Sequence, residues 1–396
     1  MEPIFFIAAL WLFLAVISAI IAHHLGISIA LVEICVGIAA AAVANHFFGK
    51  DSLGSSRQWL QFLASAASVL LTFLAGAELD PLVMKKKVKE VSIVGAVGFL
   101  APFVGATLIA HYLIGWNLAP SILAGIALST TSMAVVYAVM LETGLNKTDF
   151  GKGILGACFI NDLGTVLALG LIFSPFTYRT VVFIVSSAVI IAALPSITRF
   201  LTKVYGNRTA AIRTKWILAV LFGLGTLAYW AGTEAVLPAY VVGMVLAEFA
   251  AVEHQWIRRL RTLTTGFFTP FYFIRAGSFV SVPALIAAPL VFLVLFLAKV
   301  VTKILGLYPV IGRFRQRRKE RMYYTLMMST GLTFGTISAM FGLSHGIINE
   351  GQYSLLVATV IGSALIPTLI ANRIFLPHHL LPKAALHIPE GGLVDE

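Results

Sequence analysis

The sequence predicts an all-α polytopic membrane protein with about thirteen transmembrane helices. Hydrophobic residues make up 59% of the 396 residues and charged residues only 11%, and the mean hydropathy is +0.94. Soluble domains carry roughly 25% charged residues, so a water-soluble fold is excluded. In addition, apolar runs recur along the whole chain, each near the length of about 20 residues that spans a bilayer as a helix.

The apolar runs give the order of the expected helices. They begin near residues 4, 27, 58, 91, 117, 150, 180, 214, 233, 263, 284, 322 and 351. Some neighbouring runs are separated by only a few residues, as at 23–26 and 230–234, so hydropathy alone leaves twelve or thirteen spans open. Residues 1–22 contain no basic segment and no clear cleavage site, so we expect a retained helix rather than a signal peptide.

The distribution of Lys and Arg decides between these counts. If the N-terminus is outside, the inside connections hold basic clusters such as 85–89 and 313–321, whereas the outside connections hold only Lys50, Arg57 and Arg179. Basic residues concentrate on the cytoplasmic side of membrane proteins, so we predict an outside N-terminus, a cytoplasmic C-terminus and an odd number of helices. This bias also explains the net charge of +11, and we expect no nucleic-acid binding.

Faint internal repetition predicts two inverted six-helix repeats. Three pairs of segments are similar: FLAGAELD (73–80) with FIRAGSFV (273–280), VEICVGIAA (32–40) with PAYVVGMVLA (238–247), and STTSMAVVYAVM (129–140) with STGLTFGTISAMFGL (329–343). Each partner lies seven helices away, which gives the halves opposite orientations. We predict one transporter unit over residues 1–383: a repeat over about 4–175, a linker helix over about 180–203, a repeat over about 214–375, and then a short cytoplasmic tail over 384–396.

Asp162 is the sharpest functional signal, because it lies near the centre of an apolar run, within FINDLGT at 159–165. An ionised carboxylate at such a depth costs roughly 2.5–3.5 kcal/mol on insertion scales. Burial favours the neutral acid, so an aspartate in a watery cavity can exchange a proton for a cation. Alternatively, Asp162 pairs with a basic residue to pack helices. Asn161 either belongs to the ion site or serves as an interhelical hydrogen-bond donor.

Polar clusters predict a break in two of the helices, at residues 129–132 and 329–336. Such clusters permit unwound backbone near the membrane midplane, where carbonyl and hydroxyl groups replace the water shell of a cation. Because the clusters occupy repeat-related positions, we expect the two breaks to face each other. The alternative is ordinary hydrogen bonding of Ser and Thr to the preceding helical turn.

Lys299 and Lys303 lie four residues apart on one face of the run 290–310, so they project from the same side of a helix. Lys303 is near enough to the basic loop to extend to the inner surface, whereas Lys299 is deeper. A cation that faces Asp162 or the breaks would stabilise the cavity when no ion is bound. Arg275 is a further candidate for this role, and Glu33 is a candidate interfacial or packing carboxylate.

Other patterns lack the context that they require. GLGTLA at 223–228 matches part of a dinucleotide-binding fingerprint but lies in an apolar span without a soluble strand before it. The histidine pairs at 23–24 and 378–379 lack the i, i+4 spacing of a helical zinc site. No nucleophile beside a base is apparent, so we expect neither an enzyme nor a cofactor.

Five segments, taken in order, resemble the monovalent cation:proton antiporter superfamily, the sodium/proton exchanger-like membrane proteins. These segments are FLAGAELD, ALSTTSMAVVYAVMLETGL, GKGILGACFINDLGTVLAL, FFTPFYFIRAG and KILG. The resemblance covers nearly the whole chain. It implies a homodimer in which a core of the fourth to sixth and eleventh to thirteenth helices moves like an elevator against a scaffold of the first to third and eighth to tenth.

The family pattern also implies roles for individual residues. Asp162 would carry the ion and the proton in turn, with Thr130, Thr131 and Ser132 as further ligands from the first break. Asp162 and Thr131 would be the main contacts of the metal ion. Lys303 matches the family lysine through its K-x-x-G context, and Lys299 is the alternative.

One departure from the family pattern bears on stoichiometry. Electrogenic members carry two adjacent acids where this chain has Asn161 and Asp162, so the resemblance implies electroneutral exchange of Na⁺ or Li⁺ for H⁺. The exchange would instead be electrogenic if Lys303 also loses and regains a proton during the cycle. A K⁺/H⁺ antiporter, a cation channel and a non-transporting membrane scaffold are the alternatives. We expect a multi-pass protein of the cell membrane, specifically a bacterial inner membrane, with a role in pH homeostasis.

Overall fold

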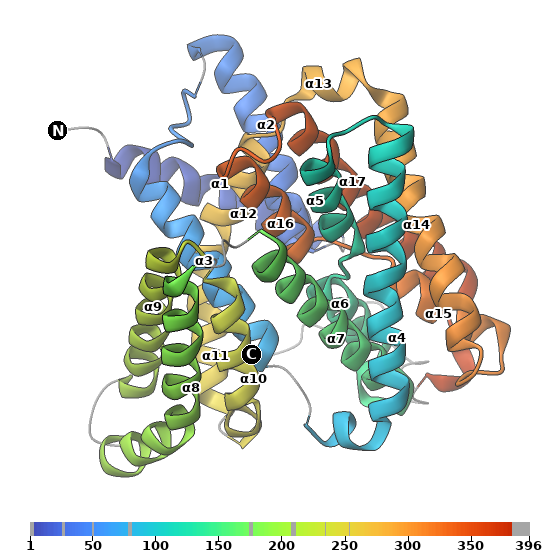
Figure 1. Ribbon diagram of the computed structural model, residues 1–396. Coiled ribbons are helices and arrows are strands. Elements are labelled where there is room, and N and C mark those ends of the chain that lie inside the picture. The colour runs from blue at the N-terminus through green and yellow to red at the C-terminus, as the bar shows by residue number, and fades with distance from the viewer. Residues whose placement is uncertain are drawn as a thin grey trace.

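The computed structural model describes residues 4–25, 28–49, 51–77, 81–173, 177–206, 211–233, 235–252 and 254–381. Within these ranges the chain is helical, with connecting turns and no strand (Figure 1). The long helices are α1 (Ile4–Leu25), α2 (Ile29–Phe48), α3 (Gln58–Ala77), α4 (Pro81–Leu108), α7 (Asp149–Ile172), α8 (Tyr178–Tyr205), α9 (Ile212–Ala231), α14 (Pro289–Ile311) and α17 (Glu350–Ile370). α4 is kinked at Lys87, whose backbone is non-helical (φ −121°, ψ 24°). The predicted all-α class is therefore confirmed.

The remaining spans are short or interrupted. They are built from α5 (Leu118–Ser129) with α6 (Met133–Thr143), α10 (Val236–Val252), α11 (His254–Leu263) with α12 (Thr269–Ser278), and α15 (Arg318–Met328) with α16 (Thr333–Ser344). A short helix, α13 (Val282–Ala287), precedes α14. By length and composition, ten helices of the described chain can cross a membrane, with α15 and α16 counted as one. Adding α5–α6, α10 and α11–α12 gives the thirteen spans that the sequence predicts.

Two helices are broken in mid-course, as the polar clusters predict. α5 stops at Ser129, and the next residue, Thr130, has extended backbone (φ −62°, ψ 151°). The second break separates α15 from α16, where Leu332 is non-helical (φ −152°, ψ −75°). The backbone N–H of Ser132 donates to the carbonyl of Thr330 at 3.0 Å. The breaks therefore face each other, which confirms that part of the prediction.

α2 and α12 pack against each other by direct backbone contact. A Cβ atom added at Gly37 would overlap the carbonyl oxygen of Ile274, and one added at Gly277 would overlap the carbonyl oxygen of Ile34. Glycine, which lacks a side chain, is what allows two helix backbones to approach this closely in a membrane protein.

α3 and α10 repeat this arrangement. A Cβ at Gly76 would overlap the carbonyl of Tyr240, and one at Gly243 would overlap the carbonyl of Phe73. In each of the four contacts, the carbonyl that the added Cβ would overlap belongs to the residue three positions before the glycine of the partner helix. All four glycines lie in the segments that resemble one another in sequence, so this reciprocity supports the predicted inverted repeats, which stay a prediction. The predicted tail, 384–396, lies outside the described residues.

The helices that carry the breaks pack with α4, α7, α14 and α17. Figure 1 shows these elements together on one side of the molecule, and α3, α8, α9 and α10 together on the other. The start of α4, the end of α8 and the end of α10 lie at one end of the bundle, whereas α13 and the connection from α2 to α3 lie at the opposite end (Figure 1). The basic segments 86–89, 199–203 and 258–261, which the sequence predicts to lie inside, adjoin these three helix ends.

Candidate ion-binding site

α7 carries Asp162 into the middle of the protein. Thr148 caps the start of this helix, because its hydroxyl accepts a hydrogen bond from the backbone N–H of Gly151 at 3.1 Å. Asp162 is 0% exposed, and neither of its carboxylate oxygens has a hydrogen-bond partner among the described residues. Buried polar atoms normally have partners. Acceptors left without donors in this way are suited to a proton or a cation.

Asn161 connects α7 to the first break. Its Nδ2 donates to the carbonyl oxygen of Ser129 at 3.2 Å, so the interhelical hydrogen bond considered from the sequence is present. Its Oδ1 is buried and has no partner in the described part of the chain. Asn161 therefore anchors the segment and leaves an acceptor oxygen available next to Asp162 in sequence.

The hydroxyl groups of the first break have different partners. Thr131 Oγ1 donates across to the carbonyl of Met328, at the end of α15, at 2.7 Å. Thr130 Oγ1 instead donates back to the carbonyl of Ala127 at 2.9 Å, and Ser132 Oγ accepts from the N–H of Val135 at 3.4 Å. The alternative of ordinary back-bonding thus applies to Thr130, while Thr131 joins the two breaks.

Lys303 of α14 reaches both breaks. Its ammonium donates to the Met328 carbonyl at 2.6 Å, to Thr131 Oγ1 at 2.7 Å and to the Thr130 carbonyl at 3.3 Å. The side chain is fully buried, so the alternative in which it extends to the inner surface is wrong. A cation at this place complements the negative ends of the helix dipoles of α5 and α15.

Lys299, one turn earlier on α14, is also fully buried and also lies at the first break. Its ammonium donates to the carbonyls of Leu128 and Thr130, at 3.0 Å each. Leu128 lies in the last turn of α5, as Met328 lies in that of α15. The sequence offered the two lysines as alternatives, whereas the fold brings both to the breaks.

Arg275, offered as a further cation for the site, lies elsewhere. Its Nε donates to the carbonyl of Ser55 at 2.8 Å, and its guanidinium lies 4.8 Å from the centroid of the Phe279 ring. That idea is wrong, because α12 directs the side chain toward the connection between α2 and α3. Glu33 is buried on α2, which packs against α1 and α12, and its Oε2 has no partner among the described residues.

Tyr240 of α10 is a neighbour of the site that sequence reasoning missed. Its hydroxyl donates to the carbonyl of Phe159 at 2.8 Å, and its ring stacks on that of Phe159 with centroids 5.2 Å apart. The same ring meets Phe334 of α16 edge-on at 6.1 Å. A signal was available, because a tyrosine in the middle of an apolar helix needs a partner for its hydroxyl.

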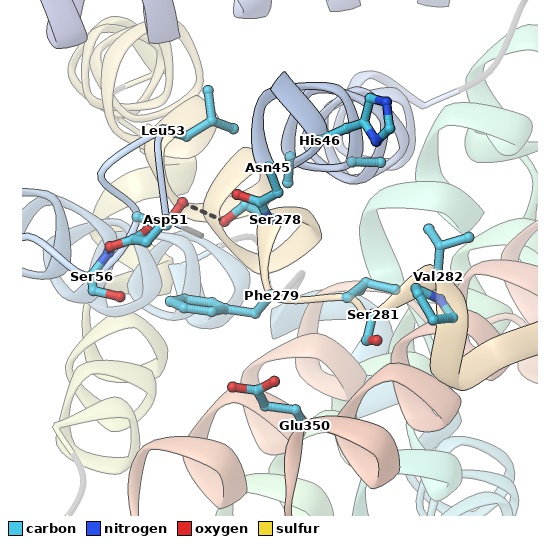
Figure 2. A pocket seen from close by; sticks show the side chains of 15 residues that line it. Asn45, His46, Asp51, Leu53, Ser56, Ser278, Phe279, Ser281, Val282 and Glu350 are labelled. Atoms are coloured by element: carbon cyan, nitrogen blue, oxygen red, sulfur yellow. Dashed lines mark hydrogen bonds between the residues drawn. The ribbon is translucent and has the colours of Figure 1, made fainter. Parts of the chain in front are cut away.

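A cavity of about 610 Å³ lies away from the breaks, at the end of the bundle that carries α13. Its polar lining includes Asn45, His46, Asp51, Ser278 and Glu350. Figure 2 shows Glu350 across the α12–α13 connection from the residues of α2. The hydroxyl of Ser278 donates to that of Ser55 at 2.7 Å. Within the described ranges, no three His, Cys, Asp or Glu residues are grouped to hold a metal ion.

Comparison with known proteins agrees with this architecture. The chain is 25% identical over 330 residues to a probable Na⁺/H⁺ antiporter 3 of Methanocaldococcus jannaschii, covering 80% of this chain and 84% of that protein. It is 26% identical over 321 residues to a Na⁺/H⁺ antiporter of Enterococcus hirae, covering 76% and 81%.

A solved structure shares the fold. The sodium proton antiporter MjNhaP1 of Methanocaldococcus jannaschii matches with a TM-score of 0.67 at 13% identity, over 92% of this chain and 95% of that one. Residues 11–376 match the protein family described as "Sodium/hydrogen exchanger, transmembrane". This match spans nearly the whole chain, and the protein therefore belongs to the sodium/hydrogen exchanger family.

Proposed function

We propose that this protein is a secondary active antiporter that exchanges a monovalent cation, Na⁺ or Li⁺, for H⁺ across the cell membrane. The observation that carries the proposal is the fully buried carboxylate of Asp162, which has no partner among the described residues and lies on the helix that Asn161 fastens to the first break. The two antiporters to which the chain is similar bear names that agree with this activity.

In the proposed cycle, a cation binds to ionised Asp162 and a proton displaces it. An empty anionic site is costly to move through a region of low polarity, so only the occupied, neutralised site crosses. Thr131 and Ser132 would supply further oxygens. Because the hydroxyl of Thr131 already accepts from Lys303, ion binding there requires a rearrangement of that contact.

The lysines act as fixed hydrogen-bond donors in this cycle. Lys299 and Lys303 hold the carbonyl ends of the broken helices, where an unpartnered row of buried carbonyl groups would be unfavourable. The site therefore keeps its form when the transported ion leaves. With Asn161 in place of a second acid, a single carboxylate exchanges one proton for one cation, and we infer electroneutral transport.

Alternating access would occur as an elevator, in which α4–α7 and α14–α17 slide against a scaffold of α1–α3 and α9–α12. The scaffold helices interlock through glycine backbone contacts, whereas side-chain hydrogen bonds from Tyr240 and Tyr353 cross between the two groups. Side-chain bonds are exchanged more easily than interlocked backbones. We further propose a homodimer formed through the scaffold, with the N-terminus outside and the C-terminus in the cytoplasm of a bacterial cell.

The test uses purified protein in liposomes with an imposed pH gradient. Cation-driven proton flux is expected for the wild type and lost in Asp162→Asn. Asp149→Asn is the matched control, because Asp149 lies exposed in the first turn of the same helix. Flux in Asp162→Asn at the wild-type level would refute the assignment. Electroneutral exchange is expected to be unaffected by an imposed membrane potential.

K⁺/H⁺ exchange is the second candidate. The chain is also similar to cation/H⁺ antiporter 17 of Arabidopsis thaliana, 24% identical over 380 residues and covering 46% of that longer protein, and that name does not specify the cation. Flux with Na⁺, Li⁺ and K⁺ in turn separates the candidates. A channel would pass cations without coupling to protons, and a non-transporting scaffold would pass none.

A further inference from the structure

Three successive carbonyl groups at the end of α5 are each held by a side chain from another helix. The carbonyls of Leu128 and Thr130 accept from the ammonium of Lys299, at 3.0 Å each. The carbonyl between them, that of Ser129, accepts from Nδ2 of Asn161 at 3.2 Å. Asn161, the residue before Asp162, is therefore bonded to the Ser129 carbonyl, and Lys299 orients the carbonyls on both sides of it.

The second break comes close to the same ammonium at Gly331. A Cβ atom at this position would overlap Nζ of Lys299 and would lie 3.1 Å from Oγ1 of Thr130 and 3.2 Å from Cε of Lys299. The φ angle of Gly331 lies outside the left-handed region that favours glycine. A side chain here would therefore displace the end of Lys299, so the role of this glycine is to leave space and not to adopt a special conformation.

Lys299 has a different set of partners from Lys303. Lys303 shares the Thr130 carbonyl with Lys299 but also joins the two breaks through Met328 and Thr131. The hydrogen bonds of Lys299 go to the end of α5. No carboxylate pairs with Lys299 among the described residues, so its buried charge is satisfied by backbone carbonyls at the negative end of a helix. Its position is suited to orienting the backbone and not to neutralising Asp162.

We propose that Lys299 is a positioning residue for cation binding. It orients the carbonyls of Leu128 and Thr130, and through Ser129 and Asn161 it sets the place of Asp162. Gly331 in the second break supplies the space that the ammonium requires. This inference rests on the proposed function of Asp162 as the ion site, and it predicts an effect on the affinity for the cation more than on the maximal rate.

The first experiment compares Lys299→Met with the wild type in Na⁺-driven proton flux in liposomes. The apparent KM for Na⁺ is expected to rise about tenfold or more, with the maximal rate changed by less than about threefold. Partial misfolding would lower the maximal rate at an unchanged KM, so KM is the informative quantity. An unchanged KM in Lys299→Met would overturn the inference.

The second experiment measures coupling between the lysine and the glycine. Gly331→Ala is expected to raise the KM for Na⁺ in the wild type and in Lys303→Met. In Lys299→Met it is expected to raise the KM by less than about twofold, because the ammonium that the added methyl group would displace is absent. Gly223→Ala is the control, because a Cβ there meets nothing within 4 Å. Equal effects of Gly331→Ala in the two lysine variants would overturn the inference.

If Lys299→Met does not fold, Gly331→Ala and Gly331→Ser test the same contact with the lysine present. KM is expected to rise in both, and an unchanged KM in both would overturn the inference. The result for Asp162→Asn separates the two proposals. If that variant loses exchange while the Lys299 and Gly331 variants keep the wild-type KM, only the role of Lys299 fails; if it retains exchange, the proposed function fails.

Discussion

The ammonium of Lys303 lies 2.7 Å from the hydroxyl of Thr131, and both groups donate to the same carbonyl, that of Met328. One small cluster thus joins α14 to both broken helices. The two breaks come from distant parts of the chain, so this cluster is where the predicted halves meet in the core.

Lys303→Met is expected to lower stability strongly. It removes a charged donor and leaves the buried Met328 carbonyl with one partner fewer, for a loss of about 1.5–3 kcal/mol. Thermal unfolding of the detergent-solubilised protein measures this loss. Thr302→Val on the same helix is the control, since Thr302 Oγ1 bonds only within α14. A variant as stable as the control would contradict the structural role.

Exchange is expected to depend on pH through competition at Asp162. Only the ionised carboxylate binds the cation, so as pH falls the apparent KM for Na⁺ should rise, by about tenfold per pH unit on the acidic side. At higher pH the KM should become constant. Initial rates over a series of pH values and Na⁺ concentrations give this slope. A hundredfold change per unit would indicate a second titrating group and contradict the one-carboxylate stoichiometry.

The glycine contacts of the scaffold should tolerate no side chain. Gly37→Ala forces a Cβ into the carbonyl of Ile274, and a backbone group cannot move aside cheaply, so we expect a loss of about 1–3 kcal/mol. Gly243→Ala, at the related position of the other pair, should cost a similar amount. Gly223→Ala, with open space around it, should be neutral. Thermal unfolding checks all three, and equal behaviour of Gly37→Ala and Gly223→Ala would refute the interlock.

Tyr240→Phe tests whether the boundary between core and scaffold slides. The variant loses a bond to Phe159 worth about 1 kcal/mol. If that bond must break during transport, its removal should raise the exchange rate up to about fivefold at an unchanged KM. Tyr324→Phe is the matched control, because its hydroxyl bonds to Gly153 within the core. A similar rate change in both variants, or in neither, would contradict the proposed movement.

The spans and the breaks were predictable from the sequence because their causes are local. A bilayer fixes the length of an apolar helix, and the polar clusters at 129–132 and 329–336 mark the interruptions directly. The burial of Asp162 followed from the same reasoning, since a polar group inside an apolar run must face protein. The bond of Asn161 across helices was one of two alternatives that the sequence left open.

The partners of the cations were less predictable because they depend on tertiary packing. Arg275 bonds to Ser55, which is 220 positions away, and no local pattern distinguishes that partner from the breaks. Spacing showed that Lys299 and Lys303 share a face, but it did not show that both reach the carbonyl ends of α5 and α15. Tyr240 was missed because its role comes from the contact of α10 with α7.

The reciprocal glycine contacts have a consequence for biosynthesis. α2 and α3 leave the ribosome well before their partners, α12 and α10, which follow roughly 160 to 240 residues later. At about 5–20 residues per second, this leaves the early helices waiting for about ten to fifty seconds in the membrane. The helix faces that carry Gly37 on α2 and Gly76 on α3 must be covered by lipid or by the insertion machinery during that interval. The contacts of α2 and α3 can therefore form only after more than half of the chain has been synthesised.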